Sequence, residues 1–196
     1  MNPNNQSIFF VILSTIFFAL QDTAVKLLSQ AGSIWQLMTL RSVLVILFLL
    51  LWVRLKGQWR GIVPTNLGWP IVRAGFMCLA YTLSYSAYPF ASLSDVAACF
   101  FTAPIFVCIF ASIFLKERIG VWRISAVIVG FLGALLIIQP GSEAFRPVLI
   151  MPLLAGACYA AGVVVTRGFC AGQPSLALTA VHNVFYAAVG FLVISL

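Results

Sequence analysis

The sequence has few charged residues. Charged side chains make up 8% of its 196 residues, only four residues are acidic, and there is one histidine. A soluble globular domain is about 25% charged and roughly half apolar, whereas 63% of this chain is hydrophobic. So little polar surface cannot coat so much apolar material, which excludes an ordinary soluble enzyme, a nucleic-acid-binding domain and a disordered segment.

The sequence also lacks the side-chain clusters that catalysis and metal binding require. Its five cysteines are scattered and form no Cys-x-x-Cys pair, so a metal site or a disulfide framework is not expected. One histidine and four separated carboxylates supply neither a nucleophile with its base nor a carboxylate pair. No GxxxxGKS/T phosphate-binding loop is present, so direct use of ATP is not expected. We therefore expect neither an enzyme nor a bound cofactor or metal.

Long apolar runs make up most of the chain. A bilayer core of about 30 Å takes roughly 20 helical residues, so the runs predict an all-α, polytopic membrane protein with about seven transmembrane helices. The first run is too long for a signal peptide and follows no Lys or Arg, which predicts a retained helix. The predicted spans are Ile8–Leu28, Ile34–Val53, Pro70–Pro89, Val96–Leu115, Val121–Gln139, Val148–Thr166 and Leu176–Leu196.

The net charge of +7 reflects the placement of cations between these spans. If the N-terminus is cytoplasmic, eight cations lie at cytoplasmic ends and two, Lys26 and Arg146, at outer ends, as the positive-inside rule requires. This bias predicts a multi-pass inner-membrane protein with a cytoplasmic N-terminus and no nucleic-acid partner. The eight cations are Arg54, Lys56, Arg60, Arg73, Lys116, Arg118, Arg123 and Arg167.

Two parts of the chain match when the sequence is shifted by 141 residues. The first predicted span then falls on the sixth, and the two spans cross the membrane in opposite directions. This pattern predicts an inverted repeat of five helices, which many secondary transporters use to build a site near the membrane midplane. The shift places Lys26 on Arg167, Leu37 on Leu178 and Arg41 on His182.

The third to fifth spans carry a series of motifs. These are Leu79-Ala80-Tyr81-Thr82, Tyr85, Ala87, Pro104, Phe114-Leu115-Lys116-Glu117-Arg118, Trp122-Arg123 and Gly130-x-x-Gly133. Over about Val11–Gly141 the chain resembles the EamA domain of the drug/metabolite transporter superfamily. In that family a Tyr-Thr helix precedes a Pro-containing helix, a Leu-x-Glu-Arg turn and a Gly-rich helix, and Arg41 also fits the family pattern.

The resemblance implies a transporter built from two five-helix domains. Family members move small polar metabolites, amino acids or drugs by alternating access. We expect a first EamA-type domain at residues 8–140 and the first two helices of a second at residues 147–196. The expected partners are the lipid bilayer and a small-molecule solute, with a homodimer or a complementing chain to supply the helices of the second domain. The alternative is a non-transporting truncated fragment or a membrane assembly partner.

Several polar residues lie inside the apolar spans, where charge is costly and marks a cavity or a partner. Arg41 is either a cavity cation for an anionic substrate group or a side chain that snorkels to the headgroups. Asp22 and Lys26 are four residues apart and can pair on one helix face. Asp22 could instead couple protons or pair with Arg41, and we place the neighbouring Gln21 with the same cavity.

Aromatic and hydroxyl side chains suggest a cavity wall. Tyr81 and Tyr85 are four residues apart on one side of the third span, where they either line the cavity or belong to an aromatic belt. Pro104, predicted inside the fourth span, is either a gate element or a structural kink. His182 is either a proton-coupling group or a packed, hydrogen-bonded histidine.

Local interactions are predicted at three further places. Ser94 or Asp95 is expected to cap the fourth span, and Glu117 to form a salt bridge with cytoplasmic cations. A stripe of small residues on the fifth span predicts a close helix–helix interface, within the domain or between subunits. The stripe consists of Ala126, Gly130, Gly133 and Ala134.

Overall fold

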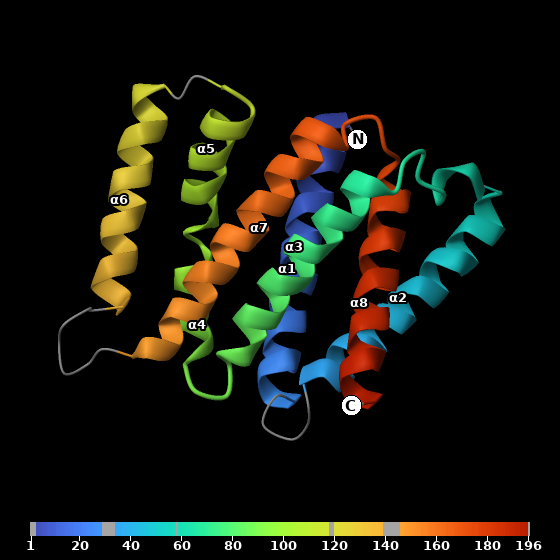
Figure 1. Cartoon of the computed structure of the whole chain (residues 1–196), viewed down its shortest axis with the longest axis horizontal. Helices are drawn as coiled ribbons and strands as arrows, with labels where there is room; N and C mark the ends of the chain where they lie inside the picture. Colours follow the sequence, from blue (N-terminus) through green and yellow to red (C-terminus); the bar gives the residue numbers. More distant parts are fainter. Residues whose placement is uncertain (1–2, 29–33, 58, 118–119, 139–145, 196) are drawn as a thin grey trace.

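The structure, a computed structural model, describes residues 3–28, 34–57, 59–117, 120–138 and 146–195, and every regular element in these ranges is a helix. The helices are stacked side by side in one bundle (Figure 1). The predicted all-α class is therefore confirmed. The helices are α1 (Pro3–Leu28), α2 (Ile34–Lys56), α3 (Gly68–Ser86), α4 (Leu93–Phe100), α5 (Ala103–Phe114), α6 (Val121–Ile138), α7 (Ile150–Phe169) and α8 (Ser175–Ser195), with 3-10 turns η1 (Trp59–Gly61) and η2 (Pro147–Leu149).

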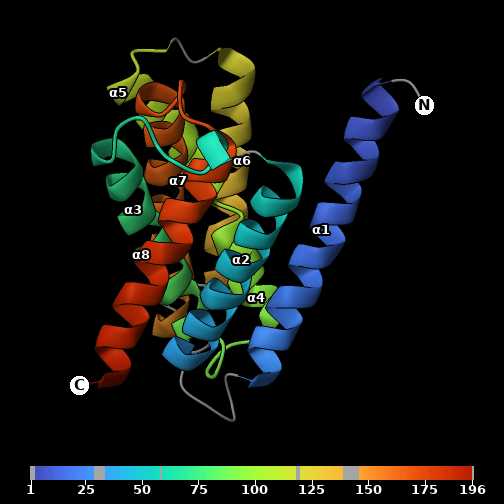
Figure 2. The same cartoon turned by 90° about the vertical axis from the view of Figure 1, so that its right-hand side faces the viewer.

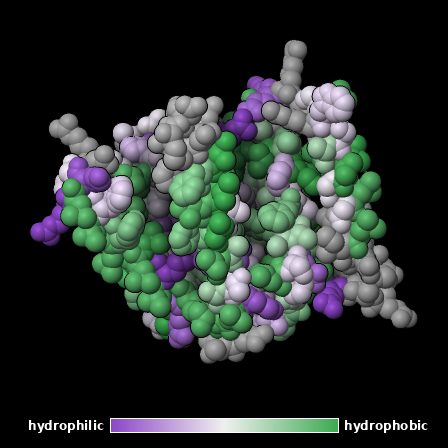
Figure 3. Space-filling model, turned by 180° about the vertical axis from the view of Figure 1, so that it is seen from behind, coloured by the Kyte–Doolittle hydropathy of each residue, from purple (hydrophilic) through white to green (hydrophobic). Residues whose placement is uncertain are grey.

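Five helical stretches of the described residues are long and apolar enough to cross a membrane, fewer than the seven predicted spans. Helix α3 is less apolar because it carries Arg73 and several hydroxyl-bearing side chains. In α6 the described apolar stretch is Ile124–Gly133, which is shorter than a full span. Hydrophobic side chains form a broad band over one face of the molecule, with most hydrophilic ones toward its margins (Figure 3). The five stretches are Val11–Leu28, Ile34–Lys56, Leu93–Phe114, Pro147–Phe169 and Ser175–Ser195.

The predicted fourth span is divided into two helices, α4 and α5. Pro104 lies in the first turn of α5. Backbone N–H groups in a first turn have no partner within the helix, so a proline there costs no hydrogen bond. The expectation of one helix with an interior proline was wrong, because Pro104 starts a new helix. Helix α7 approaches this break closely: a Cβ at Gly156 would lie 3.2 Å from the Phe100 carbonyl oxygen and 3.2 Å from the Thr102 hydroxyl.

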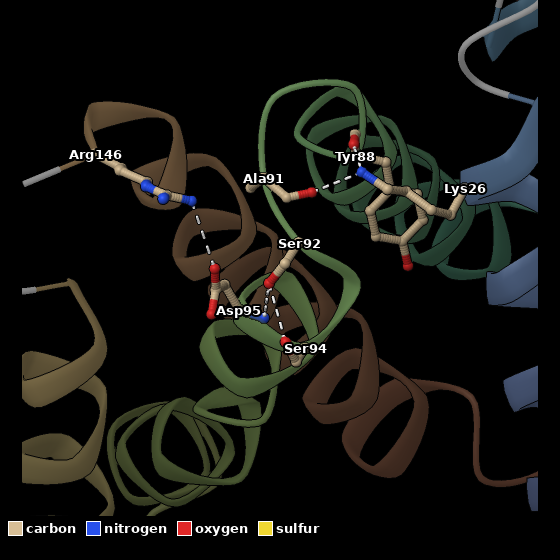
Figure 4. Close-up of polar contacts among 7 residues, drawn as sticks. All are labelled: Lys26, Tyr88, Ala91, Ser92, Ser94, Asp95 and Arg146. Atoms are coloured by element: carbon tan, nitrogen blue, oxygen red, sulfur yellow. Dashed lines mark hydrogen bonds and ion pairs between the residues drawn. The ribbon is translucent and has the colours of Figure 1, made fainter.

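The start of α4 differs from the prediction in its capping residue. Ser92 is the N-cap, and its Oγ accepts a hydrogen bond from the Asp95 backbone N–H at 3.1 Å (Figure 4). Ser94, one of the two predicted caps, instead lies 2.9 Å from Ser92 through its hydroxyl. The Asp95 carboxylate is thereby free to form an ion pair with Arg146 at 3.8 Å, which connects α4 to the start of η2.

The central packing of the bundle joins helices that are far apart in the sequence. Helix α3 packs against α7 and α8, α2 against α8, and α5 against α7. Glycines on α7 and α8 allow this close approach. A Cβ at Gly162 would lie 2.9 Å from the Met77 side chain, and a Cβ at Gly190 would overlap the Thr39 hydroxyl.

Helix α1 stands beside the bundle and contacts it near its C-terminal end (Figure 2). Lys26 donates hydrogen bonds to the carbonyl oxygens of Tyr88 and Ala91, the latter at 2.7 Å (Figure 4). The structure thus gives Lys26 partners other than the predicted Asp22. Most other side chains of α1 are exposed, as expected for a helix that faces lipid.

The predicted small-residue stripe contributes one close contact between helices. A Cβ at Gly130 would lie 3.0 Å from Ile105 Cδ1, so Gly130 lets α6 approach α5. Ala126 is exposed, and a Cβ at Gly133 would meet no atom of the described structure within 4 Å. The side chain of Ala134 lies outside the described part of the structure, as do Arg118, Gln139 and Leu196.

The helix boundaries repeat at the spacing of 141 residues found in the sequence. Helix α1 ends at Leu28 and α7 at Phe169, while α2 begins at Ile34 and α8 at Ser175. The members of each pair run in opposite directions (Figure 1). In the loop after α5, Glu117 forms the expected salt bridge, with the Arg167 guanidinium of α7 at 2.8 Å.

Candidate functional site

Two cavities lie on either side of Tyr81. The first, here called the arginine cavity, has a volume of about 250 Å³ and lies among α2, α3, α7 and α8. The second, here called the aspartate cavity, has a volume of about 290 Å³ and lies among α1, α3 and α4. The arginine cavity is lined by Arg41, Val45, Arg73, Met77, Tyr81, Tyr159, Thr179, His182 and Asn183. The aspartate cavity is lined by Asp22, Tyr81, Ser84, Tyr85 and Tyr88, together with mostly apolar residues of α1 and α4.

Arg41 reaches the arginine cavity from α2. Its guanidinium carbon lies 5.3 Å from the centre of the Tyr81 ring, within cation–π range. The His182 ring lies 5.9 Å from the Tyr81 ring, and the Tyr186 ring lies 6.0 Å from the His182 ring. Residues from α2, α3 and α8 therefore form one continuous cationic and aromatic wall.

Arg73 contributes a second guanidinium to the same cavity, from the first half of α3. Its Nε donates to the Thr166 hydroxyl at 2.8 Å, and one amino group donates to the Leu178 carbonyl oxygen at 3.4 Å. The Thr166 hydroxyl in turn donates to the Gly162 carbonyl oxygen at 2.7 Å. Arg73, which the sequence places just inside the third predicted span and counts among the cytoplasmic cations, is thus held inside the bundle by α7 and α8.

The arginine cavity also contains polar atoms with unused hydrogen-bonding capacity. His182 Nδ1 and Asn183 Oδ1 are buried and have no hydrogen-bond partner among the described residues. The Asn183 amide nitrogen donates to the Thr179 carbonyl oxygen at 2.8 Å, which fixes the orientation of the side chain. A concave site with a few convergent polar groups is the usual form of a small-molecule site.

The aspartate cavity is organised around Tyr85. The Tyr85 hydroxyl accepts a hydrogen bond from Gln21 Nε2 at 2.9 Å and donates to Asp22 Oδ1 at 3.3 Å. The Tyr85 ring lies between those of Tyr81 at 5.7 Å and Tyr88 at 5.3 Å. Tyr81 and Tyr85 of α3, with Tyr88 just after the helix, therefore connect the polar end of α1 with the arginine cavity.

The structure brings most of the predicted site residues together. Arg41, Tyr81 and His182 line the arginine cavity, Asp22 and Tyr85 line the aspartate cavity, and Gln21 bonds to Tyr85. Pro104 is exposed and lines neither cavity.

Sequence reasoning did not assign four residues that bring polar groups to the lining of the arginine cavity. One signal was available for Arg73, which lies on the same stripe of four-residue spacing as Met77, Tyr81 and Tyr85. The others carry no such signal, because ordinary hydroxyl and amide side chains occur throughout membrane helices. The four are Arg73, Tyr159, Thr179 and Asn183.

The charged side chains that line the arginine cavity are arginines. In the part of the chain that the structure describes, no group of three or more His, Cys, Asp or Glu side chains is placed to hold a metal ion. Guanidinium groups are hydrogen-bond donors that cannot act as acceptors. The arginine cavity is therefore suited to an organic or anionic ligand.

Comparison with known proteins gives a family match. The model of the EamA-like transporter family matches residues 5–139, about two thirds of the chain. This range includes α1 to α6, and with them Asp22, Arg41, Arg73 and the tyrosines of α3. No solved structure matches the chain.

Curated relatives match the chain at low identity. A riboflavin transporter of Brucella anthropi is 29% identical over 108 residues, which cover 55% of this chain and 38% of that protein. A riboflavin transporter of Vibrio cholerae is 25% identical over 142 residues, covering 71% and 43%. Solute carrier family 35 member G1 of Mus musculus is 36% identical over 69 residues, covering 35% and 19%. The chain thus spans less than half the length of the curated relatives it matches.

Proposed function

The chain belongs to the EamA-like transporter family, and from this premise we propose that it acts as a multi-pass secondary transporter. It would move a small organic solute across the membrane by alternating access. The observation that carries the proposal is the arginine cavity, because its Arg41, Arg73, Tyr81 and His182 come from three different helices and line one cavity. Costly charges inside membrane helices are retained where they face a substrate pathway.

The proposed architecture is a five-helix EamA-type domain at residues 8–140, followed at residues 147–196 by the first two helices of an inverted second domain. In this architecture α3 and α6 also cross the membrane, which makes about seven spans. The proposal is supported by the helix ends that repeat at 141 residues and by the opposite directions of the paired helices. It is also supported by Arg41 and His182, which the shift superimposes and which line the same cavity.

The proposed orientation places the N-terminus in the cytoplasm of a cell with an inner membrane. The last turns of α2 and α7 carry Arg54, Lys56 and Arg167, and these turns lie at one end of the bundle. The last turn of α1, which carries Lys26, lies at the opposite end together with η2. The end with more cations is the cytoplasmic one under the positive-inside rule.

The first solute to test is riboflavin. Three of the relatives are riboflavin transporters, and the cavities of this chain offer tyrosine rings against which a planar ring system can pack. A panel of amino acids, polyamines, nucleosides and dyes extends the test to other small solutes. The lipid bilayer and the solute are the partners that this function requires.

The experiment is solute flux into proteoliposomes that contain the 196-residue chain. We expect a flux above that of protein-free vesicles, and we expect Arg41→Ala to reduce it by about 10-fold or more, as for the loss of one charge-assisted contact. Arg54→Ala, an exposed position at the end of the same helix, is the matched control. If no solute of the panel crosses, the transporter assignment fails and a role as an assembly partner takes its place. If Arg41→Ala leaves every flux unchanged, the assignment of the cavity is wrong.

A further inference from the structure

We propose that the arginine cavity binds the anionic group of a small solute, a carboxylate or a phosphate, between the guanidinium groups of Arg41 and Arg73. The cavity would thereby favour an anion over the neutral analogue of the same shape. This inference rests on the proposed function, because it names the chemical class of solute that the transporter takes. It goes beyond riboflavin, which carries no carboxylate or phosphate.

The first argument is the number of unused donors in the cavity. Each guanidinium has five N–H donors and no acceptor. Among the described residues, the acceptor recorded for Arg41 is the Met38 sulfur at 3.7 Å, and a thioether is a weak acceptor. Arg73 uses its Nε and one amino group for Thr166 and Leu178, which leaves the remaining N–H groups for a ligand. Carboxylate and phosphate oxygens are the acceptors that guanidinium groups bind most strongly.

The second argument is the balance of charge. Arg41 and Arg73 both line the arginine cavity, together with Tyr81 and His182. In the described parts of the chain neither arginine lies within ion-pair distance of a carboxylate. Asp22 lies on the other side of Tyr81, in the aspartate cavity, where it accepts a hydrogen bond from Tyr85. An anion bound at the two guanidinium groups would form charge-assisted hydrogen bonds with them, whereas a neutral ligand of the same shape would form weaker ones.

The third argument is the shape and lining of the cavity. Its volume of about 250 Å³ is just below the range of roughly 300–1,000 Å³ typical of small-molecule sites. Tyr81 and Tyr159 supply aromatic faces, and the open atoms of His182 and Asn183 can bond to further polar groups. The solute class that this lining fits is a compact, planar or aromatic compound that bears one carboxylate or phosphate.

The same chemistry could also come from the phosphate of an anionic lipid headgroup. We therefore test binding in nanodiscs of two compositions, one of phosphatidylcholine alone and one that contains phosphatidylglycerol. The probes are benzoate and benzamide, which have nearly the same shape and differ in charge. Binding of each is measured by saturation-transfer NMR on the 196-residue chain, a readout that requires no transport.

We expect benzoate to bind the unmodified chain roughly 10- to 100-fold more tightly than benzamide in phosphatidylcholine nanodiscs, as for one or two charge-assisted hydrogen bonds. Arg41→Gln and Arg73→Gln should each remove most of this preference, and Arg41→Lys should restore part of it because the charge returns without the planar fork. Arg54→Gln is the control and should keep the preference. If phosphatidylglycerol displaces benzoate, the anion site is confirmed and a lipid headgroup is an occupant.

Two outcomes would overturn the inference, and they separate it from the proposed function. If benzoate and benzamide bind the unmodified chain equally, and Tyr81→Leu weakens both, the cavity binds solutes without selecting anions. The transporter assignment then stands and the inference fails. If neither probe binds and no solute crosses in proteoliposomes, both fail together. The comparison of the two probes on the unmodified chain decides the matter even if a variant does not fold.

Discussion

The crossing of α2 and α8 offers a sharp test of the structure, because these helices carry Arg41 and His182. At this crossing a Cβ added to Gly190 would overlap the Thr39 hydroxyl, while Thr39 Cβ would lie 3.2 Å away. The Thr39 hydroxyl donates to the Trp35 carbonyl oxygen of its own helix at 2.7 Å, so rotating it away breaks that bond. Gly190→Ala should therefore strain the crossing, and removal of the Thr39 hydroxyl should relieve the strain.

The magnitudes follow from opposing contributions. Overpacking lowers the free energy of unfolding by about 1–3 kcal/mol, whereas the higher helix propensity of alanine raises it by about 1 kcal/mol. Gly190→Ala should therefore lower the free energy of unfolding by about 0–2 kcal/mol. Thr39→Ala removes a hydrogen bond within α2 but introduces a residue of higher helix propensity, so we expect it to change the free energy of unfolding by no more than about 0.5 kcal/mol. The double variant should be more stable than the sum of the two single effects by about 1–2 kcal/mol.

The assay is a double-variant cycle in mixed micelles. The free energy of unfolding is measured by titration with SDS for the unmodified chain, both single variants and the double variant, with helix content followed by circular dichroism. Gly133→Ala serves as the control, since a Cβ at that position meets no described atom within 4 Å and should not couple to Thr39. A coupling below about 0.5 kcal/mol would mean that the two effects add, and the reasoning about this crossing would be refuted.

Three further predictions concern polar contacts between helices. Tyr85→Phe removes the hydroxyl that joins α3 to α1. It should lower the free energy of unfolding in the same SDS titration by about 0.6–1.7 kcal/mol, as for other interhelical hydrogen bonds in membranes. An unchanged free energy of unfolding would show that this contact does not stabilise the bundle. Thr166→Val removes the acceptor of Arg73 Nε and should reduce solute flux, with Thr166→Ser as the control that keeps the hydroxyl; equal flux in both variants would contradict this role. Glu117→Gln breaks the exposed ion pair with Arg167 and should lower the free energy of unfolding by no more than about 1 kcal/mol. In 1 M salt the unmodified chain and the variant should be equally stable, because salt screens a surface ion pair. A larger difference, or one that salt does not change, would argue against a surface ion pair.

Much of the candidate site could be predicted from the sequence, because helical periodicity is local. The spacing of Tyr81 and Tyr85 identifies one face of α3, and a charge such as Arg41 within an apolar span identifies a cavity or a partner. Arg73 shows the limit of this approach. Its position just inside a span led us to count it with the cytoplasmic cations, and only the neighbouring Thr166 and Leu178 show that its side chain is held inside the bundle.

Details at the helix ends could not be predicted either. Which of several serines caps α4 depends on the backbone conformation before the helix, where Ser92 is extended and can reach the Asp95 N–H. Pro104 suits both a kinked helix and the first turn of a new one. The closely packed Gly156 of α7 lies at this break, and that neighbour is remote in sequence.

The sequence by itself determined that this protein is helical and lies in a membrane, because composition and apolar run length leave no other way to satisfy the backbone in lipid. It also determined which end of the bundle carries most cations. Only the tertiary structure decided which helices are neighbours. Lipid is as apolar as the helix surfaces, so hydrophobicity does not select one packing over another, and small residues such as Gly162 and Gly190 let particular helices approach. That packing brings Arg41, Arg73 and His182 to a single cavity.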